Sequence, residues 1–513
     1  MTRFYLTTAI DYANGEPHIG HAYEKIGADA IARYHRLRGD QVQFLTGLDE
    51  HGQKVAQAAA DRGVSPQQFV DDIASRFQTM WQRLGVSYDR FIRTTESGHK
   101  RGVRALIERI HERNPDDFYE QSYEGWYCVG CELFKRDNEI VDGRCVLHPT
   151  RTLEWTTERN WFFRLSRYQS FIKKLFDERP DFLRPETRRN EILSLLDQGL
   201  EDISITRSRL AWAIPFPLRT STGEEQGTWV WFDALPNYLT ATGFPDAGYD
   251  TRWPAQLHVI GKDITRLHCV IWPAMLQSAG LPLPERVWAH GFVLLSGERF
   301  SKSAGVRLDL DEAIGRYGAD ALRYFLLREV PFDADGSFSF ERFDERYTAD
   351  LANSLGNLAS RAIAMVEKYC DGVAPAGAVG AVGALDAADA VDLAEYHAAI
   401  EGGRGYLLQD ALAAVMRCVS RGNEFVQSSQ PWALAKDPSR RGELEAVLAA
   451  IVRQLARHAL HLAPFMPQKA QELWAQLGGP DTVSAQRFAA AHTLDVTGWH
   501  VTKGAPLFPK PAS

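Results

Sequence analysis

The feature that most constrains the fold is a polar turn near the start of the chain, set between an apolar strand and an amphipathic helix. Residues 4–10 form a short apolar run, as expected of a buried parallel strand. Apolar residues then recur at helical spacing over 23–37, and the helix is predicted to end at Gly39. The turn between them, residues 17–21, has the sequence Pro-His-Ile-Gly-His. In an open parallel sheet, ligands bind at such turns, and the N-terminus of the helix favours phosphate groups.

Two histidines make this turn a candidate binding site. His18 and His21 are three residues apart, so they project from one side of the first helical turn. Gly20 lies between them and leaves room for a flat ring against the backbone. When these residues are considered alone, a capped turn with two solvated histidines explains them equally well.

A second strand ends in another polar turn. Residues 42–46 run into Gly-Leu-Asp-Glu-His-Gly at 47–52, and a helix rich in Ala and Gln is expected over 54–61. Asp49 is a candidate for binding a ligand amine or a ribose, although a helix N-cap explains it equally well. The alternation of strands and helices continues to about residue 115 and predicts a Rossmann-like, doubly wound α/β domain with a parallel sheet.

The next segment carries a metal-binding pattern. Cys128 and Cys131 form a CxxC pair, and Cys145 and His148 form a CxxH pair 13 residues later. Two such pairs on tight turns complete a tetrahedron around Zn²⁺, and four protein ligands leave no open position for catalysis. The spacing therefore predicts one structural zinc ion, in preference to three unrelated buried cysteines and a surface histidine.

The α/β pattern stops at this segment and resumes later. Residues 116–228 are interpreted as an insertion that carries the zinc site, because strands and helices alternate again from Val230. Strands are expected over 257–260 and 287–294. The loop at 297–305 has two cations, two hydroxyl groups and two glycines. This composition suits a mobile phosphate-binding loop, but it also suits an ordinary charged hairpin tip.

From about residue 343 to the end, the sequence predicts helices. Amphipathic helices are expected over 351–366, 393–408, 410–428 and 443–462, which indicates a C-terminal α-helical bundle. A chain of 513 residues is long enough for several domains. The expected divisions are the first half of the α/β domain (1–115), an inserted connective domain with the zinc knuckle (116–228), the second half of the α/β domain (229–294), a connecting domain with the charged loop (295–345) and a helical domain (346–513).

Charge and hydropathy exclude several classes of protein. The net charge of −8 argues against non-specific coating of nucleic acid, while a local basic surface for nucleic acid stays compatible with it. No apolar run approaches the length of a membrane span, and the N-terminus enters the first strand without the layout of a signal peptide. We therefore expect a cytoplasmic protein, in which the six cysteines do not form a disulfide framework.

The two polar loops, taken in this order, resemble the signatures of the class I aminoacyl-tRNA synthetases. His-Ile-Gly-His at 18–21 matches the first signature in full, and Arg-Phe-Ser-Lys-Ser at 299–303 stands where the family has Lys-Met-Ser-Lys-Ser. Within this class, the chain is most similar to the methionyl-tRNA synthetases over nearly its whole length. The similarity is carried by residues 9–15, 46–52, the four-ligand knuckle, 230–234, 258–263, 290–292, 357–361 and 430–432.

The resemblance implies a reaction and a set of site residues. A methionine–tRNA ligase makes methionyl-adenylate from methionine and ATP, and transfers the methionyl group to initiator and elongator tRNA(Met) for protein synthesis. Catalysis would depend on His18, His21, Arg299 and Lys302, with Mg²⁺ accompanying the ATP. The methionine pocket would be formed by Ile10, Tyr12, Asp49, Trp231, Ala234, Leu235, Tyr238 and His268, and the ATP site by His18, Gly20, His21, Gly261, Asp263, Val293, Ser301, Lys302 and Ser303.

The resemblance also places tRNA recognition in the helical region. Asn357, Arg361 and Trp432 would contact the anticodon, although a core tryptophan explains Trp432 equally well without the resemblance. The chain departs from the family at Arg299 and Phe300, which replace Lys and Met in the second signature. It ends where the helical domain of the family normally ends, without the dimerisation module of some members, so we expect a monomer.

Three other functions fit parts of the sequence. Another class I synthetase, for a small apolar or sulfur amino acid, is disfavoured by the knuckle and by Gln-Pro-Trp at 430–432. A nicotinamide-dependent oxidoreductase needs G-x-G-x-x-G at the first turn, where the chain has Asn-Gly-Glu-Pro-His. A non-catalytic nucleic-acid adaptor has no need of an intact pocket and both signature loops.

Overall fold

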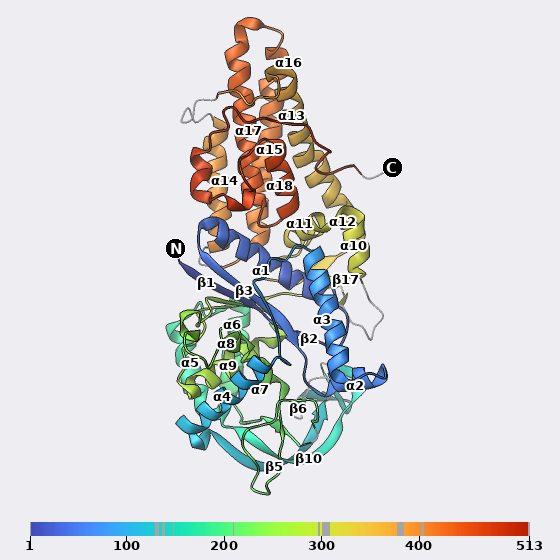
Figure 1. The fold of residues 1–513 in the computed structure, drawn as a ribbon, viewed down its shortest axis with the longest axis vertical. Helices are drawn as coiled ribbons and strands as arrows, with labels where there is room; N and C mark the ends of the chain where they lie inside the picture. Colours follow the sequence, from blue (N-terminus) through green and yellow to red (C-terminus); the bar gives the residue numbers. More distant parts are fainter. Residues whose placement is uncertain are drawn as a thin grey trace.

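A seven-stranded parallel sheet lies at the centre of the molecule (Figure 1). Its strands follow the order β11–β16–β15–β1–β3–β2, and β4 also pairs with β3. Every pair in this sheet is parallel, so the carboxyl ends of the strands meet at one edge. The strands are β1 (Arg3–Thr8), β2 (Asp11–Tyr12), β3 (Gln41–Asp49), β4 (Arg90–Arg93), β11 (Leu183–Arg184), β15 (Leu257–Gly261) and β16 (Val287–His290). The computed structural model describes residues 2–128, 133–135, 139–146, 148–208, 210–295, 298–299, 308–376, 384–401 and 405–510.

Helices cover both faces of the sheet because successive side chains of each strand point to opposite sides. Phe4 and Leu6 belong to one hydrophobic cluster, and Tyr5 between them belongs to a second. The first cluster includes residues of α1 (Ile19–Arg38) and α3 (Pro66–Arg83). The second includes residues of α4 (Ser97–Arg113) and α9 (Trp272–Ala279). These two layers confirm the predicted α/β class.

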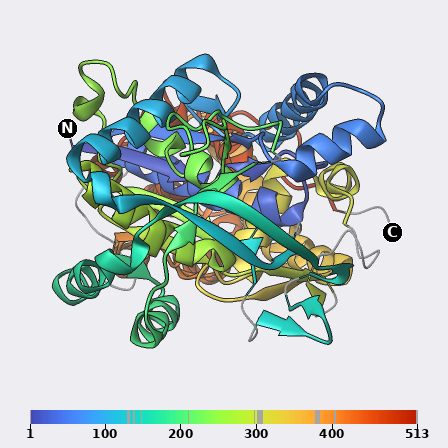
Figure 2. The ribbon, with the colours of Figure 1, turned by 90° about the horizontal axis from the view of Figure 1, so that it is seen from below.

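A long antiparallel ribbon extends from the sheet domain. It consists of β5 (Phe118–Cys128) and β10 (Glu154–Phe163), paired from Phe118↔Phe163 to Tyr127↔Glu154. Figure 2 shows it crossing the lower end of the molecule. Within the range expected for an insertion, 116–228, β11 nevertheless pairs with β16 and forms one edge of the main sheet.

The C-terminal region is helical, as predicted, and forms the upper part of Figure 1. Its core is continuous with one side of the sheet, because a single hydrophobic cluster joins Tyr23 of α1 to Leu448 and Leu455 of the bundle. Within the part of the chain that the structure describes, no helix combines the length and apolar character needed to cross a membrane. The bundle helices are α13 (Asn357–Cys370), α14 (Ala384–Glu401), α15 (Leu408–Ser429), α17 (Arg441–Leu462) and α18 (Pro467–Gln476).

Two element predictions need correction. The strand expected over 287–294 is two strands in different sheets, β16 and β17 (Val293–Leu295). The chain turns at Gly291, where a Cβ atom would lie 2.0 Å from the carbonyl oxygen of Ala334, and β17 then pairs with β19 (Gly336–Phe338). The helix expected over 393–408 ends at Glu401 as α14 and begins earlier than expected. By contrast, α1 and its end at Gly39, where φ is 100°, are confirmed.

Candidate active site

The turn of residues 18–21 begins α1 with a capping box made by two histidines. His18 is the N-cap, and its Nδ1 accepts a hydrogen bond from the backbone N–H of Gly20 at 3.1 Å. The Nδ1 of His21 accepts one from the backbone N–H of His18 at 3.4 Å. Because each Nδ1 is an acceptor, the proton of each neutral imidazole is on Nε2. Both rings therefore present an Nε2–H donor at the positive end of the helix dipole.

The stacked rings of His18 and His21 leave little room for a side chain at residue 20. The imidazoles of His18 and His21 lie 3.6 Å apart with an interplanar angle of 23°. A Cβ atom on residue 20 would lie 3.1 Å from Cε1 of His18, closer than nine in ten real Cβ contacts, so a larger residue would push the ring of His18 outward. Gly20 thus lies against the ring of His18, and a ligand ring against its backbone stays a prediction.

A buried group of charges lies next to this turn. The Nζ of Lys25 donates to Asp11 Oδ1 at 2.6 Å and to Glu24 Oε1 at 2.8 Å, and Asp11 Oδ1 lies 4.0 Å from Nε2 of His21. Burial raises the pKa of Asp11 to about 7, against the lowering effect of Lys25. Burial also acts to raise the pKa of Glu24, but Lys25 and His290 outweigh it and hold this pKa below its usual value. The sequence analysis did not identify this group, whose signal in α1 is the charged pair Glu24-Lys25 between the apolar residues Tyr23 and Ile26.

A second polar pair is formed by Tyr238 and His268. The Nδ1–H of His268 donates to the carbonyl oxygen of Ile264 at 3.0 Å, so its Nε2 accepts the hydroxyl proton of Tyr238 at 2.7 Å. Burial lowers the pKa of His268 to about 4, so this ring is neutral at pH 7. The pair therefore holds a fixed, uncharged polar contact inside an apolar environment.

Most residues predicted for a methionine pocket lie in one region. Ala234, Leu235 and Tyr238 are buried on or beside two short helices, α7 (Val230–Ala234) and α8 (Asn237–Thr240). Tyr12 of β2 lies opposite the buried Asp49 at the end of β3. One hydrophobic cluster contains Ile10, Tyr12, Trp231, Leu235 and Tyr238.

A buried triad that sequence analysis missed ties this region together. The carboxylate of Asp233 in α7 accepts from Nδ1 of His51 at 2.6 Å and from Nε2 of His99 at 2.8 Å. Burial favours the neutral acid, but the two histidines outweigh it and hold the pKa of Asp233 at about 2. His51 and Asp233 lie in two of the motifs that carry the family resemblance, 46–52 and 230–234. Their pairing depends on a contact between residues 182 positions apart in the sequence.

The remaining predicted ATP-site residues lie at the end of β15 and in a separate three-stranded sheet that contains β17 and β18 (Glu298–Arg299). Gly261 ends β15 and is in register with His290 of β16, and the exposed Asp263 follows it. Val293 is buried in β17. The backbone of Arg299 in β18 pairs with β17. The side chain of Arg299 and residues Ser301, Lys302 and Ser303 lie outside the described residues.

Comparisons with known proteins agree with this geometry. A family model described as tRNA synthetases class I (M) matches residues 4–150 and 137–363. A methionine–tRNA ligase of Rhizobium meliloti is 44% identical over 99% of the chain and 98% of its own length. One of Thermosynechococcus vestitus is 44% identical over 93% of the chain and 90% of its own length. The chain belongs to the class I methionyl-tRNA synthetases.

Solved structures of this family have the same fold. Mycobacterium tuberculosis methionyl-tRNA synthetase in complex with methionyl-adenylate superposes with a TM-score of 0.92 at 40% identity, covering 99% of the chain and all of that structure. The apo form of the same enzyme gives a TM-score of 0.85 at 37% identity. The arrangement of this methionyl-tRNA synthetase is therefore more similar to the adenylate complex than to the apo form.

The structure describes some of the four residues expected to bind zinc in this synthetase. Cys128 ends β5, and Cys145 lies in β8 (Arg144–Cys145) in register with His148 of β9 (His148–Thr152). The side chains of Cys128 and Cys145 are both buried. Cys131 and the side chain of His148 lie outside the described residues. Two buried thiols beside a tight hairpin suit a structural zinc ion.

Among the described residues, one other group has the composition of a metal site. Asp389, Cys418 and His458 lie buried in the helical bundle with ligand atoms within 4.8 Å of one another. However, Asp389 already binds the guanidinium of Arg421 at 2.5 Å, and Arg457 lies 3.8 Å away. Burial raises the pKa of Cys418 to about 12, which keeps the thiol protonated. Two adjacent cations and a neutral thiol disfavour a metal ion here.

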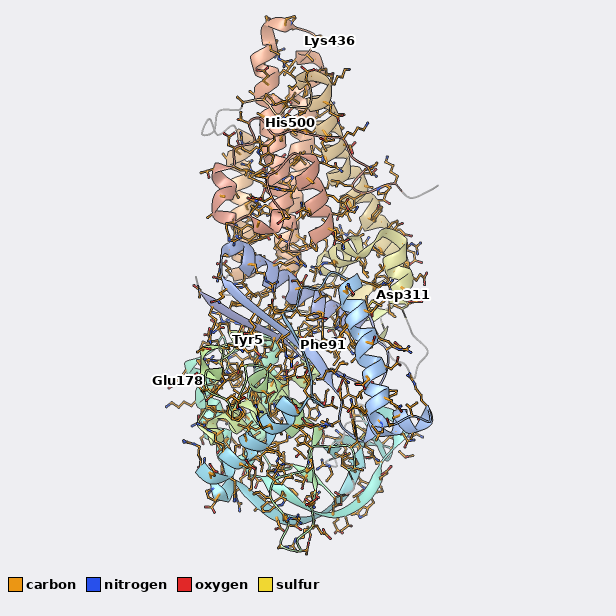
Figure 3. The ribbon with its side chains drawn as sticks, viewed as in Figure 1. Tyr5, Phe91, Glu178, Asp311, Lys436 and His500 are labelled. Carbon is orange, nitrogen blue, oxygen red and sulfur yellow. The ribbon has the colours of Figure 1, made fainter. Side chains whose placement is uncertain are left out.

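The residues expected at the anticodon lie in the helical region of this synthetase. Trp432 is in α16 (Pro431–Leu434) with 36% of its surface exposed, so it is not a core tryptophan. The guanidinium of Arg361 lies 5.8 Å from the centre of its ring, and Asn357 is exposed at the start of α13. Lys436, two residues after α16, marks the far tip of the molecule in Figure 3.

Proposed function

We propose that the chain is a methionine–tRNA ligase, which activates methionine with ATP and transfers the methionyl group to tRNA(Met). The observation that carries this proposal is membership of the methionyl-tRNA synthetases along 99% of the chain, together with the fold of an adenylate-bound relative. Two features support it: histidine donors for phosphates at the N-terminus of α1, and apolar side chains packed around the fixed Tyr238–His268 pair.

The methionine pocket proposed here uses shape and a small number of polar contacts. Aromatic and aliphatic walls suit an unbranched thioether, because sulfur makes favourable contacts with aromatic rings. The carboxylate of Asp49 holds the substrate ammonium, and the neutral pair of Tyr238 and His268 orients the ligand. The walls are Ile10, Tyr12, Trp231, Ala234 and Leu235.

In the first step, the methionine carboxylate attacks the α-phosphorus of ATP and pyrophosphate leaves. The protein contributes positioning and charge stabilisation rather than a covalent intermediate. His18 and His21 donate their Nε2–H groups to phosphate oxygens. Lys302 closes over the leaving pyrophosphate, Arg299 adds a second positive charge, and Ser301 and Ser303 belong to the same proposed nucleotide site. Gly20, Gly261, Asp263 and Val293 complete the nucleotide site.

Two metal ions belong to this proposal. Mg²⁺ would accompany ATP and would supply neutralisation of charge on the nucleotide. Cys128, Cys131, Cys145 and His148 would hold one Zn²⁺, which would supply structural cross-linking of the knuckle. The buried thiols of Cys128 and Cys145 support this assignment.

The proposed division of labour follows the shape of the molecule. The α/β halves (1–115 and 229–294) hold the small substrates, the connective domain (116–228) carries the knuckle, the connecting domain (295–345) carries the signature loop, and the helical domain (346–513) reads the anticodon. The partners are ATP, methionine and initiator and elongator tRNA(Met), and the enzyme acts as a monomer in the cytoplasm.

Pyrophosphate–ATP exchange across the twenty amino acids tests the proposed chemistry. We expect methionine to support exchange far better than any other amino acid. Efficient exchange with another small apolar or sulfur amino acid, and none with methionine, would assign the chain to a different specificity within the class. An absence of exchange with every amino acid would contradict the proposed function.

A further inference from the structure

Two buried carboxylates share one lysine beside the histidines of the 18–21 turn. The side chain of Lys25 is fully buried and donates to both Asp11 and Glu24. Glu24 also lies 3.1 Å from Nε2 of His290 on β16. Asp11 is 7% exposed, and its second oxygen, Oδ2, has no hydrogen-bond partner among the described residues. One lysine charge thus stands against two carboxylates, in a site that must accept the phosphates of ATP.

Asp11 is the member of this group that faces His21. Its Oδ1 lies 4.0 Å from Nε2 of that ring. This Nε2 carries the imidazole proton, because Nδ1 accepts from the backbone N–H of His18. An ionised Asp11 therefore attracts the hydrogen that His21 donates to a phosphate, and it also repels the phosphate itself.

We propose that Asp11 takes up a proton when ATP binds, and that this uptake frees the Nε2–H of His21 for the phosphates. A proton from solvent bonds to a carboxylate oxygen of Asp11 as the nucleotide arrives, no other bond forms or breaks, and the proton is released after pyrophosphate leaves. Asp11 is thus a positioning residue that acts through His21. The inference rests on the proposed function, since it assumes that ATP binds at this turn.

The surroundings of Asp11 single it out as the group that changes protonation. The charged and titratable side chains around it are His21, Glu24 and Lys25 of α1 and, through Glu24, His290 of β16. Glu24 stays ionised because Lys25 and His290 lower its pKa against the effect of burial. Burial brings the pKa of Asp11 to about 7, and the negative charge of bound phosphates would raise it further.

Calorimetric titration of the full-length protein with ATP and excess Mg²⁺, in buffers of different ionisation enthalpy, counts the protons taken up. At pH 7 we expect the wild type to take up a fraction of a proton per ATP, because burial raises the pKa of Asp11 and leaves the group partly protonated before binding. Asp11→Asn resembles the protonated acid, so this variant should not show that uptake. At pH 8.5, where wild-type Asp11 is more fully ionised, the variant should bind ATP several-fold more tightly than the wild type, and the difference should disappear as the pH falls toward 6.

Glu16→Gln is the matched control. It removes the same charge two residues before His18, but Glu16 is half-exposed and pairs with Arg76. This variant should keep the proton uptake of the wild type. If Asp11→Asn does not fold, Asp11→Ser removes the same charge with less bulk.

The outcomes separate the two proposals. Tight ATP binding by the wild type without proton uptake, or equal uptake in the wild type and the Asp11 variant, overturns the role of Asp11 alone. Failure of the folded wild type to bind ATP contradicts the proposed function and the role of Asp11 with it.

Discussion

At the scale of single residues, hydrogen bonds fix which nitrogen of each histidine carries the proton. The two rings of the 18–21 turn accept through Nδ1 from backbone N–H groups, whereas His268 donates through Nδ1 to Ile264. The first two histidines are therefore donors at Nε2, and His268 is an acceptor there. The same residue type thus offers donors for the proposed phosphate binding in one place and orients a tyrosine in the other.

The pair of Tyr238 and His268 gives a direct test of the methionine pocket. Tyr238→Phe removes the hydroxyl that orients the ligand in the proposed pocket, and one hydrogen bond contributes about 0.5–1.5 kcal/mol. We therefore expect the KM for methionine in pyrophosphate exchange to rise by about 2- to 13-fold, with little change in the KM for ATP. Tyr119→Phe is the control: it removes a hydroxyl on β5 that is bonded to Asp202, and it should leave both constants unchanged. Equal behaviour of the two variants would remove Tyr238 from the pocket.

The buried triad gives a prediction for stability and its pH dependence. Both His51 and His99 donate to Asp233, and an asparagine accepts from only one of them, so Asp233→Asn should leave one buried donor unsatisfied and destabilise the fold by about 1–3 kcal/mol at pH 7. Because the pKa of Asp233 is lowered to about 2, its stabilising effect is complete above about pH 4 and is lost as the pH falls toward 2. Urea unfolding of the wild type and the variant between pH 2.5 and 7 should show their difference shrinking over that interval.

Asp246→Asn is the control for this measurement. Asp246 forms an exposed ion pair with Arg101, so its loss should change the free energy of unfolding by less than about 1 kcal/mol. A difference between wild type and Asp233→Asn that stays constant down to pH 2.5 would show that the histidines do not stabilise an ionised Asp233.

At the scale of elements, sequence periodicity predicted the features that neighbouring residues determine, such as the end of a helix. The end of α1 at Gly39 follows from helical periodicity and a residue that adopts positive φ. The break at Gly291 and the addition of β11 to the main sheet depend on contacts with Ala334 and with β16, far away in the sequence, and periodicity carries no information about them. For the same reason, the polar turns were identified as candidate sites, while the partners Asp11–Lys25 and His51–Asp233 were not.

The zinc knuckle can be tested by measuring the zinc content of the protein. Chelator-free protein should contain about one zinc ion per chain, and Cys145→Ser should lose it together with the order of the knuckle. Cys418→Ser is the matched control, because Cys418 belongs to the buried bundle group that the charges of Arg421 and Arg457 exclude as a metal site. Zinc that persists in Cys145→Ser and disappears in Cys418→Ser would place the metal in the bundle instead.

At the scale of the whole molecule, the central sheet lies between two ends that are built from different elements (Figure 1). The ribbon of β5 and β10 lies at one end, and α16, with its exposed Trp432, lies near the other (Figure 1). A tRNA whose acceptor end enters the sheet domain must reach toward the far end of the bundle with its anticodon. An exposed indole stabilised by Arg361 suits the stacking of an unpaired base.

Trp432 tests this arrangement. Trp432→Ala should lower kcat/KM for tRNA by about 5- to 150-fold, the equivalent of the 1–3 kcal/mol of one base–aromatic stack, while methionine-dependent pyrophosphate exchange stays near normal. Trp432→Phe keeps an aromatic face and should lose much less. A parallel loss in charging and exchange would instead show that Trp432 supports the fold.

The most direct test of the whole account is to offer unfractionated tRNA and each of the twenty amino acids in turn, and to identify the charged species. The account predicts that methionine alone is attached, and only to initiator and elongator tRNAs with the CAU anticodon. Attachment of a different amino acid, or of methionine to tRNAs with other anticodons, would contradict it.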